Sequence, residues 1–225
     1  MKSLQQLQAV IHYQFTDEQL LQTAITHRSF SKKRNNETLE FLGDSVLGLV
    51  ISEHLYKRLS KASEGELSRI RASLVKEDAL ATVARDISLG DYLQLGSGEL
   101  KSGGYRRTSI LSDAMEALFG AIYLDSGFEQ CKKTILFLYD EYLVTLPSPV
   151  DLKDPKTSLQ EYLQSNKHDL PVYEVVQTEG KSHDQTFTVE CRIEGLDLVT
   201  KGKGPSRKKA EQMAASLALK KARHE

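Results

Sequence analysis

Hydrophobic and polar positions divide the chain into two parts with different periodicities. Up to about residue 145, apolar residues recur three and four positions apart, as in LEFLGDSVLGLVISEHLYKRL and SDAMEALFGAIYLDSGF, which is typical of helices. The later segments are shorter, and one of them carries apolar residues on alternate positions, as a strand does. The first part is therefore expected to be all-α. The second is expected to run helix, strand, strand, strand, helix over residues 156–166, 172–180, 184–193, 196–204 and 206–222.

A proline-containing segment separates the two parts. Three of the five prolines lie within TLPSPVDLKDP, and a helix cannot continue there because proline lacks an amide hydrogen and restricts the residue before it. We predict a multi-domain protein with a first domain over residues 1–145, whose core spans about 4–127. A linker over 146–153 and an α-β-β-β-α domain over 154–224 follow.

The last predicted helix is expected to lie on the sheet with one face. Ala210, Met213, Ala214 and Leu217 recur at the i, i+3, i+4, i+7 spacing of such a face. Cys191 alternates with apolar residues on the middle strand and is expected to be a small core residue.

Composition narrows the class of protein. The chain is 40% hydrophobic and 27% charged, which is ordinary for a globular protein with a buried core. Its first residues lack the apolar run of a secretory signal, and no stretch of about 18 apolar residues could span a bilayer, so we expect a cytoplasmic location. Cys131 and Cys191 lie far apart without CxxC or Cys/His spacing, so neither a disulfide framework nor a zinc site is predicted.

Charge is unevenly distributed along the chain. The formal net charge is −1, which by itself does not suggest a nucleic-acid partner. Between Lys201 and Arg223, however, there are eight basic residues against the single acidic residue Glu211. One end of the chain is therefore strongly cationic.

Acidic residues occur at helical spacing in two apolar segments of the first part. Glu37, Glu40 and Asp44 sit at i, i+3 and i+7, and Asp113 and Glu116 at i, i+3. Such a stripe of like charges destabilises a helix, and partly buried carboxylates cost several kcal/mol unless they are paired or bind a metal.

If the two helices pack together, four carboxylates converge, those of Glu40, Asp44, Asp113 and Glu116. Hard oxygen ligands of this kind suit Mg²⁺ or Mn²⁺. Glu64, in ASEGELSRIR, is a further acid that is expected to be more exposed. Each acid taken alone would more often be a solvated or salt-bridged helix residue, and a single structural cation is an alternative, but the grouping without His or Cys favours phosphodiester chemistry.

Four motifs together resemble the bacterial ribonuclease III family of double-stranded RNA-specific endoribonucleases. The run NETLEFLGDS from Asn36 to Ser45 is similar to the signature of that family, and THRSF, EGELS and SDAMEA, which begin at Thr26, Glu64 and Ser112, follow its order of motifs. The α-β-β-β-α segment resembles a double-stranded RNA-binding domain. The resemblance covers nearly the whole chain.

The resemblance implies roles for the six acids. Glu40, Asp113 and Glu116 would hold a catalytic Mg²⁺, for which Mn²⁺ could substitute, and Asp44 and Glu116 would be needed most directly for hydrolysis. Either one ion or two could act there. Two further acids would line the cleavage valley, namely Glu37 and Glu64.

The resemblance also implies partners and products. The family acts as a homodimer and leaves a 5′-phosphate, a 3′-hydroxyl and a two-nucleotide 3′ overhang, and its bacterial members process ribosomal RNA precursors and some messenger and transfer RNA precursors.

Lys208 and Lys209 stand at the start of the last predicted helix. Cations are disfavoured at a helix N-terminus, and an incoming phosphate would explain their presence there. The family resemblance adds Gln160, Glu161 and His183 as contacts to the minor grooves of RNA.

Two other functions compete with a nuclease. A non-catalytic RNA-binding protein on the same scaffold would not need the intact set of acids. A metal-dependent phosphohydrolase acting on small phosphate esters would have no use for the basic C-terminal part.

Overall fold

The computed structural model describes residues 3–146, 153–180 and 185–223. The chain divides into two compact units, Met1–Pro149 and Val150–Glu225. Most of the predicted linker, and the Lys181–Asp184 segment with His183, lie outside the described residues. Among the helices described, none is long and apolar enough to cross a membrane.

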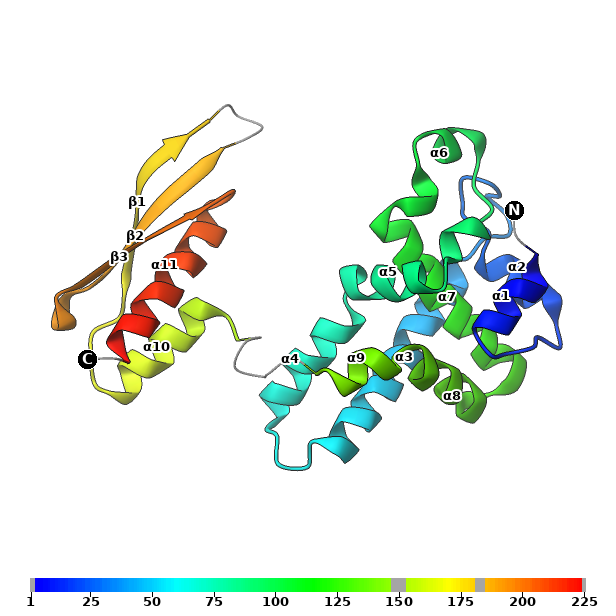
Figure 1. The fold of residues 1–225 in the computed structure, drawn as a ribbon, viewed down its shortest axis with the longest axis horizontal. Coiled ribbons are helices and arrows are strands. Elements are labelled where there is room, and N and C mark those ends of the chain that lie inside the picture. The colour runs from blue at the N-terminus through cyan, green and yellow to red at the C-terminus, as the bar shows by residue number, and fades with distance from the viewer. Residues whose placement is uncertain (1–2, 147–152, 181–184, 224–225) are drawn as a thin grey trace. The chain divides into compact units, whose positions relative to one another are not determined.

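The first unit is built from helices, as its periodicity predicts (Figure 1). α7 is the most apolar of the long helices, and it packs against α2, α3, α5 and α8. The described α-helices of this unit are α1 Leu4–Val10, α2 Glu18–Ala24, α3 Glu37–Arg58, α4 Glu64–Val75, α5 Glu77–Asp86, α6 Ser97–Lys101, α7 Thr108–Ser126, α8 Phe128–Leu138 and α9 Asp140–Val144.

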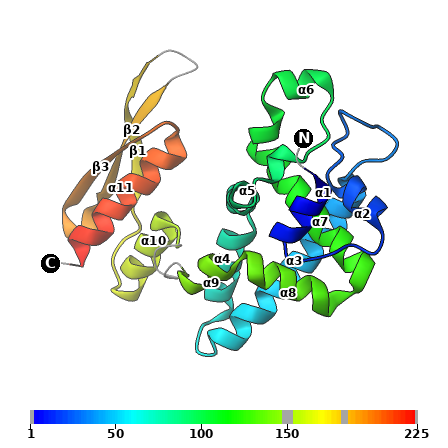
Figure 2. The same cartoon turned by 45° about the vertical axis from the view of Figure 1, so that its right-hand side comes forward.

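In its described residues, the second unit has a three-stranded antiparallel sheet in the order β1-β2-β3 and two α-helices. Figure 2 shows α11 lying along the sheet, and α10 packs against α11. The predicted α-β-β-β-α order is confirmed. Its elements are α10 Pro155–Ser165, β1 Val172–Glu179, β2 Thr186–Ile193, β3 Leu198–Gly204 and α11 Arg207–Ala222.

The face that α11 turns to the sheet differs from the predicted one. Ala210 and Ala214 are buried, but Met213 and Leu217 are 51% and 39% exposed. A Cβ atom at Gly202 on β3 would lie 2.3 Å from the carbonyl oxygen of Ala210, so helix and strand nearly touch. Only small side chains fit such a contact, and the buried residues of α11 are alanines throughout, namely Ala210, Ala214, Ala215, Ala218 and Ala222. Cys191 is fully buried on β2, as expected.

Candidate metal centre

Two glycines bring α3 and α7 into backbone contact. A Cβ atom at Gly43 would lie 1.8 Å from the carbonyl oxygen of Glu116, and one at Gly120 would lie 2.2 Å from the carbonyl oxygen of Leu39. Any side chain at either position would force the helices apart. The acids of α3 and those of α7 consequently lie side by side.

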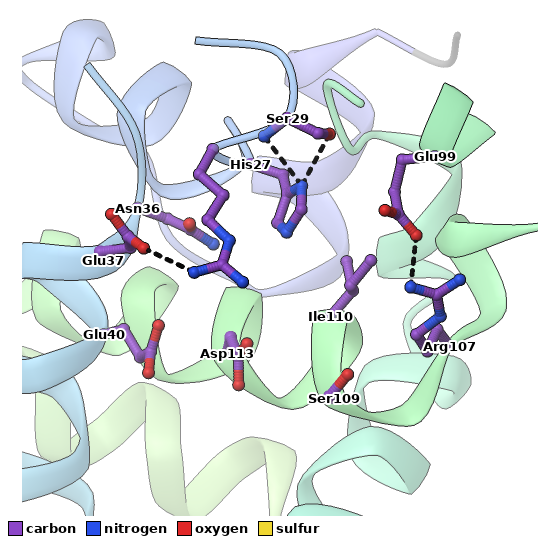
Figure 3. Close-up of a pocket in the computed structure, with 11 residues that line it drawn as sticks. His27, Ser29, Asn36, Glu37, Glu40, Glu99, Arg107, Ser109, Ile110 and Asp113 are labelled. Atoms are coloured by element: carbon purple, nitrogen blue, oxygen red, sulfur yellow. Dashed lines mark hydrogen bonds and ion pairs between the residues drawn. The ribbon is translucent and has the colours of Figure 1, made fainter. Parts of the chain in front are cut away.

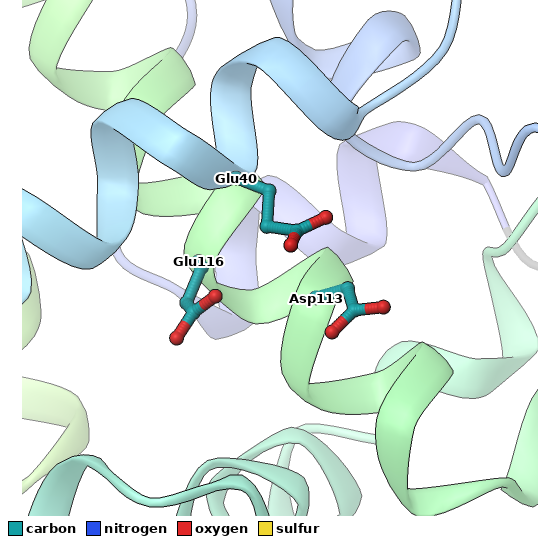
Figure 4. Close-up of side chains that lie close together, drawn as sticks. All are labelled: Glu40, Asp113 and Glu116. Carbon is teal, nitrogen blue, oxygen red and sulfur yellow. The ribbon is translucent and has the colours of Figure 1, made fainter.

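Three carboxylates meet where the helices touch. Glu40 on α3 and Asp113 and Glu116 on α7 each offer an oxygen, and these oxygens all lie within 4.8 Å of one another (Figure 4). The three side chains are half-buried. A set of oxygen ligands without His or Cys suits a hard cation such as Mg²⁺.

Burial and mutual repulsion disfavour the charged forms of these acids. Burial, followed by the charges of Asp44, Glu40 and Asp113, raises the pKa of Glu116 to about 8. The pKa of Glu40 is raised by burial and by the neighbouring charges of Asp113 and Glu37. Burial also raises the pKa of Asp113, although a hydrogen bond from Ser112 and the charges of His27 and Arg28 oppose the shift. A bound cation would relieve this repulsion.

The other predicted acids lie outside the cluster of three. Asp44 is exposed on α3 and is not one of the three clustered acids. Its negative charge nevertheless contributes to the raised pKa of Glu116. Glu37 is exposed and pairs with Arg28. Glu64 is the first residue of α4, and it lines a separate groove together with Leu49 and Tyr56. The structure thus brings together three of the four carboxylates that were expected to converge.

A polar pocket of about 460 Å³ adjoins Glu40 and Asp113 (Figure 3). It contains cations as well as acids, since Arg28 pairs with Glu37 and Arg107 pairs with Glu99. The pocket is lined by His27, Arg28, Ser29, Asn36, Glu37, Glu40, Glu99, Arg107, Ser109, Ile110 and Asp113.

Backbone pairing between two distant segments builds one wall of this pocket. The amide of His27 donates to the carbonyl of Gln94, and the amide of Gln94 donates to the carbonyl of Ile25. The Ser29 hydroxyl accepts from the amide of Gly96 at 3.0 Å and lies 2.7 Å from Nδ1 of His27. The segment before α3 is thereby joined to the segment before α6.

Sequence reasoning assigned no role to Arg28, Glu99 or Arg107. Arg28 lies within the THRSF motif, but Glu99 and Arg107 come from a polar stretch without helical periodicity. The one sequence signal for Arg107 is the adjacent pair Arg106-Arg107, directly before the helix that carries Asp113 and Glu116. Only the folded chain shows that they share a pocket with the acids.

The predicted RNA contacts of the second unit are exposed where they are described. Gln160 and Glu161 lie on the exposed side of α10, where Glu161 pairs with Lys153. Lys208 and Lys209 are exposed in the first turn of α11.

Comparison with known proteins assigns each of the two units to a known protein family. Residues 17–142 match the family described as Ribonuclease-III-like, and residues 155–222 match the double-stranded RNA binding motif. The chain belongs to the ribonuclease III family. This confirms the resemblance seen in the motifs, and it makes the chain a member of a family of endoribonucleases.

Named relatives of this family match almost from end to end. Ribonuclease 3 of Shewanella denitrificans is 55% identical, covering 97% of this chain and 96% of that protein, and Ribonuclease 3 of a Marinomonas species is 57% identical, covering 96% and 95%. The crystal structure of the nuclease domain of ribonuclease III from Campylobacter jejuni is 44% identical with a TM-score of 0.62. It covers 65% of this chain and all of that domain.

Proposed function

We propose that this member of the ribonuclease III family is a double-stranded RNA-specific endoribonuclease that hydrolyses phosphodiester bonds with Mg²⁺. It would leave 5′-phosphate and 3′-hydroxyl ends with two-nucleotide 3′ overhangs. The observation that carries the proposal is the meeting of Glu40, Asp113 and Glu116 in a chain whose other unit matches an RNA-binding motif.

The three carboxylates fit the proposed cation. Their oxygens are close enough to share one ion, and burial together with the neighbouring carboxylate charges raises the pKa of Glu116, which a bound cation would counteract. Glu40, Asp113 and Glu116 would hold Mg²⁺, with Mn²⁺ able to substitute. When bound, the ion supplies Lewis acidity, which lowers the pKa of water and neutralises charge on the phosphate.

The remaining acids would act around this centre. Asp44, exposed on α3, would orient the attacking water through its carboxylate oxygens and accept a proton from it, and with Glu116 it would be needed most directly for hydrolysis. Glu37 and Glu64 would line the cleavage valley.

The second unit would hold the RNA duplex. Lys208 and Lys209 would bind backbone phosphates, and Gln160, Glu161 and His183 would meet successive minor grooves. The exposure of the four described residues supports this assignment. Specificity for RNA over DNA would come from contacts to 2′-hydroxyl groups.

We further propose a homodimer formed through the first unit. Phe41, Leu49 and Tyr56 lie along one side of α3 and are 79%, 58% and 73% exposed. Leu49 and Tyr56 line a groove of about 630 Å³, and such an apolar surface is unusual without a partner. A second copy is the proposed partner, because a structure of the Campylobacter jejuni nuclease domain is described in terms of its dimer formation. Sedimentation equilibrium tests this: a monomer at micromolar concentration would contradict it.

In the cell, we propose processing of ribosomal RNA precursors and of some messenger and transfer RNA precursors in the cytoplasm. The similarity to the bacterial protein named Ribonuclease 3 from Shewanella denitrificans supports these roles. Comparing precursor ends in cells with and without the protein would test them, and unchanged ends would contradict them.

Cleavage of a long perfect RNA duplex with Mg²⁺ is the deciding experiment, comparing the native chain with Glu116→Gln. The substitution keeps the shape of the side chain and removes one carboxylate charge, so the rate is expected to fall by roughly a thousandfold or more while RNA binding persists. If neither protein cuts and both bind, the chain is a binding protein. Cleavage of small phosphate esters without RNA would favour a phosphohydrolase.

A further inference from the structure

The pocket beside the acidic cluster contains two ion-paired arginines that the proposed hydrolysis does not use. The Arg28 guanidinium lies 3.3 Å from Glu37, and the Arg107 guanidinium lies 2.5 Å from Glu99. Figure 3 shows Glu37 at one side of the pocket and the Glu99–Arg107 pair at the other, with Asp113 between them. Arg28, paired with Glu37, and Arg107, paired with Glu99, therefore line one pocket, and the charge of Arg28 also acts on Glu40 and Asp113.

The pocket needs positive charge if it is to receive RNA. Its lining contains the four carboxylates of Glu37, Glu40, Glu99 and Asp113, and these repel a phosphate backbone. A cation held by the cluster would neutralise charge around Glu40 and Asp113. The guanidinium groups in the lining, which could attract the neighbouring phosphates of a strand, are those of Arg28 and Arg107.

Both guanidinium groups remain accessible. The side chains of Arg28 and Arg107 are 70% and 49% exposed, although each is paired. Exposed ion pairs contribute little to stability, so a phosphate can replace the carboxylate at little cost to the fold. Arginine has five N–H donors in a planar fork, which matches the oxygens of a phosphate.

Local structure holds both residues at the pocket. Arg28 follows His27, whose amide donates to Gln94, and Arg107 directly precedes α7, the helix of Asp113. Arg107 also donates to the Ser102 hydroxyl at 3.3 Å. Their backbones are thus placed before RNA arrives, while their long side chains can still exchange partners.

We propose that Arg28 and Arg107 bind the RNA phosphates on the two sides of the scissile phosphate. Glu37 and Glu99 hold the guanidinium groups in the pocket until the phosphates replace them. This assignment rests on the proposed endoribonuclease function and adds the residues that position the cleaved strand.

The salt dependence of cleavage tests the assignment. We would measure kcat/KM on a long perfect RNA duplex with Mg²⁺ over a range of salt concentrations for the native chain, Arg28→Gln and Arg107→Gln. Each lost phosphate contact is expected to make the slope of log(kcat/KM) against log[salt] shallower by about 0.7 to 0.9. At moderate salt, kcat/KM is expected to fall roughly tenfold, mainly through KM.

Three further variants separate phosphate binding from a structural role. Arg106→Gln removes a neighbouring exposed charge whose guanidinium lies 4.9 Å from the centre of the Tyr105 ring, and it is expected to keep the native slope. Arg107→Lys retains the charge and should keep most of the slope, even if Arg107→Gln proves unstable. Glu99→Gln breaks the same ion pair from its other side, and it is expected to keep the slope and lower KM.

The outcomes distinguish this assignment from the proposed function. If the native chain does not cut duplex RNA, the proposed function fails. If it cuts, and Arg28→Gln and Arg107→Gln both keep the native slope, the phosphate assignment is overturned and the proposed function stands. A fall in kcat/KM that is equal in Glu99→Gln and Arg107→Gln, with the native slope in both, would show that the ion pair only orders the segment before α7.

Discussion

In both units of the chain, a glycine allows two elements to pack in close contact, but the charged residues nearby are half-buried acids in the first unit and exposed lysines in the second. Gly43 brings α3 against α7, and Gly202 brings α11 against β3, each at a distance that a larger residue would not allow. In the first unit this contact carries acids into a half-buried position, where the pKa of Glu116 rises to about 8. In the second unit it buries alanines, and the cations Lys208 and Lys209 stay exposed.

The difference shows how burial decides what a charged group can do. Half-buried like charges repel one another strongly, so they favour a bound cation. Exposed charges repel one another little because water and salt screen them, and they stay accessible for contact with the phosphates of a polyanion. Under the proposed function, the first unit would therefore hold a cation and the second would bind phosphates.

The largest expected effect comes from breaking the helix contact of the first unit. Gly43→Ala would put a Cβ atom 1.8 Å from the carbonyl oxygen of Glu116, and backbone cannot move aside as a side chain does. We expect the free energy of unfolding to fall by about 3 kcal/mol or more, and Mg²⁺ binding to weaken. Chemical denaturation and calorimetric titration with Mg²⁺ measure the two effects.

Gly98→Ala is the matched control in the same unit. A Cβ atom there would meet nothing within 4 Å, and Gly98 lies within α6. This substitution should stabilise the helix by about 0.5 to 1 kcal/mol. Equal unfolding midpoints for the two variants would show that close contact between α3 and α7 is not required.

The corresponding change in the second unit is Gly202→Ala. Its Cβ atom would lie 2.3 Å from backbone atoms of both Ala210 and Ala214, so α11 must move away from β3. We expect a loss of about 2 to 3 kcal/mol in that unit and weaker RNA binding, with Mg²⁺ affinity unchanged. Hydrogen exchange of β2 amides measures the local loss.

Gly195→Ala serves as the control for this change. Its added Cβ atom would make an ordinary contact of 3.5 Å with Asp169 Oδ2, so its effect should stay within about 0.5 kcal/mol. We expect Gly202→Ala to affect the second unit alone. A fall in the Mg²⁺ affinity of this variant would contradict that expectation.

The raised pKa of Glu116 predicts how the metal-free first unit responds to pH. The unfolded chain loses this proton near the ordinary value of 4.5, whereas the folded chain keeps it until about pH 8. The protonated group therefore stabilises the fold fully below about pH 4.5, and this contribution is lost as pH rises through about 8. Glu116→Gln is neutral at every pH, so it should raise the free energy of unfolding by roughly 1 to 3 kcal/mol near pH 8.5.

Near pH 4 the same substitution should change the free energy of unfolding by only a few tenths of a kcal/mol. Thermal unfolding without metal at both pH values makes the comparison. The exposed Glu129 is the control, because Glu129→Gln should have an effect within about 0.5 kcal/mol at either pH. If the free energies of unfolding of the native chain and Glu116→Gln differed by the same amount at both pH values, the raised pKa of Glu116 would be contradicted.

The smallest expected effect concerns the exposed cations of the second unit. Lys208 lies in the first turn of α11, where the helix dipole disfavours positive charge. Lys208→Gln should therefore stabilise the unit by about 0.3 to 1 kcal/mol while making the salt slope of RNA binding shallower by about 0.7 to 0.9. Thermal unfolding and binding titrations at several salt concentrations measure both.

Lys220→Gln provides a control of opposite sign. Lys220 lies in the last turn of the same helix, where positive charge is favoured, so its removal should destabilise the unit slightly. If Lys208→Gln also destabilised it, the lysine would have a structural partner and would not be free for phosphate.

Much of the fold follows from local patterns. The three-four spacing of apolar residues predicts α3 and α7, and the alternation around Cys191 predicts β2, because these periodicities are properties of a helix and a strand themselves. The spacing of Glu37, Glu40 and Asp44 likewise follows from the chain alone. It does not say which of the three is buried, and Glu40 proves to be the half-buried one.

The side of α11 that meets the sheet illustrates the same limit. Met213 and Leu217 are the larger apolar residues and were expected to be in the core, but they are half-exposed. Gly202 and Gly204 on β3 bring the helix so close that alanines fill the contact. A hydrophobic pattern records which residues avoid water, whereas the distance between two elements decides which of them fit.

The sequence by itself determined the types and order of the elements, the separation into two units and the acids at helical spacing. The tertiary structure alone decided that Glu40, Asp113 and Glu116 meet while Asp44 stays outside, and that Arg28, Glu99 and Arg107 share one pocket. The physical reason is the separation along the chain over which each property is determined. Periodicity depends on residues a few positions apart, but burial and electrostatic environment depend on how closely distant segments approach, and here backbone contacts at Gly43 and Gly120 set that approach.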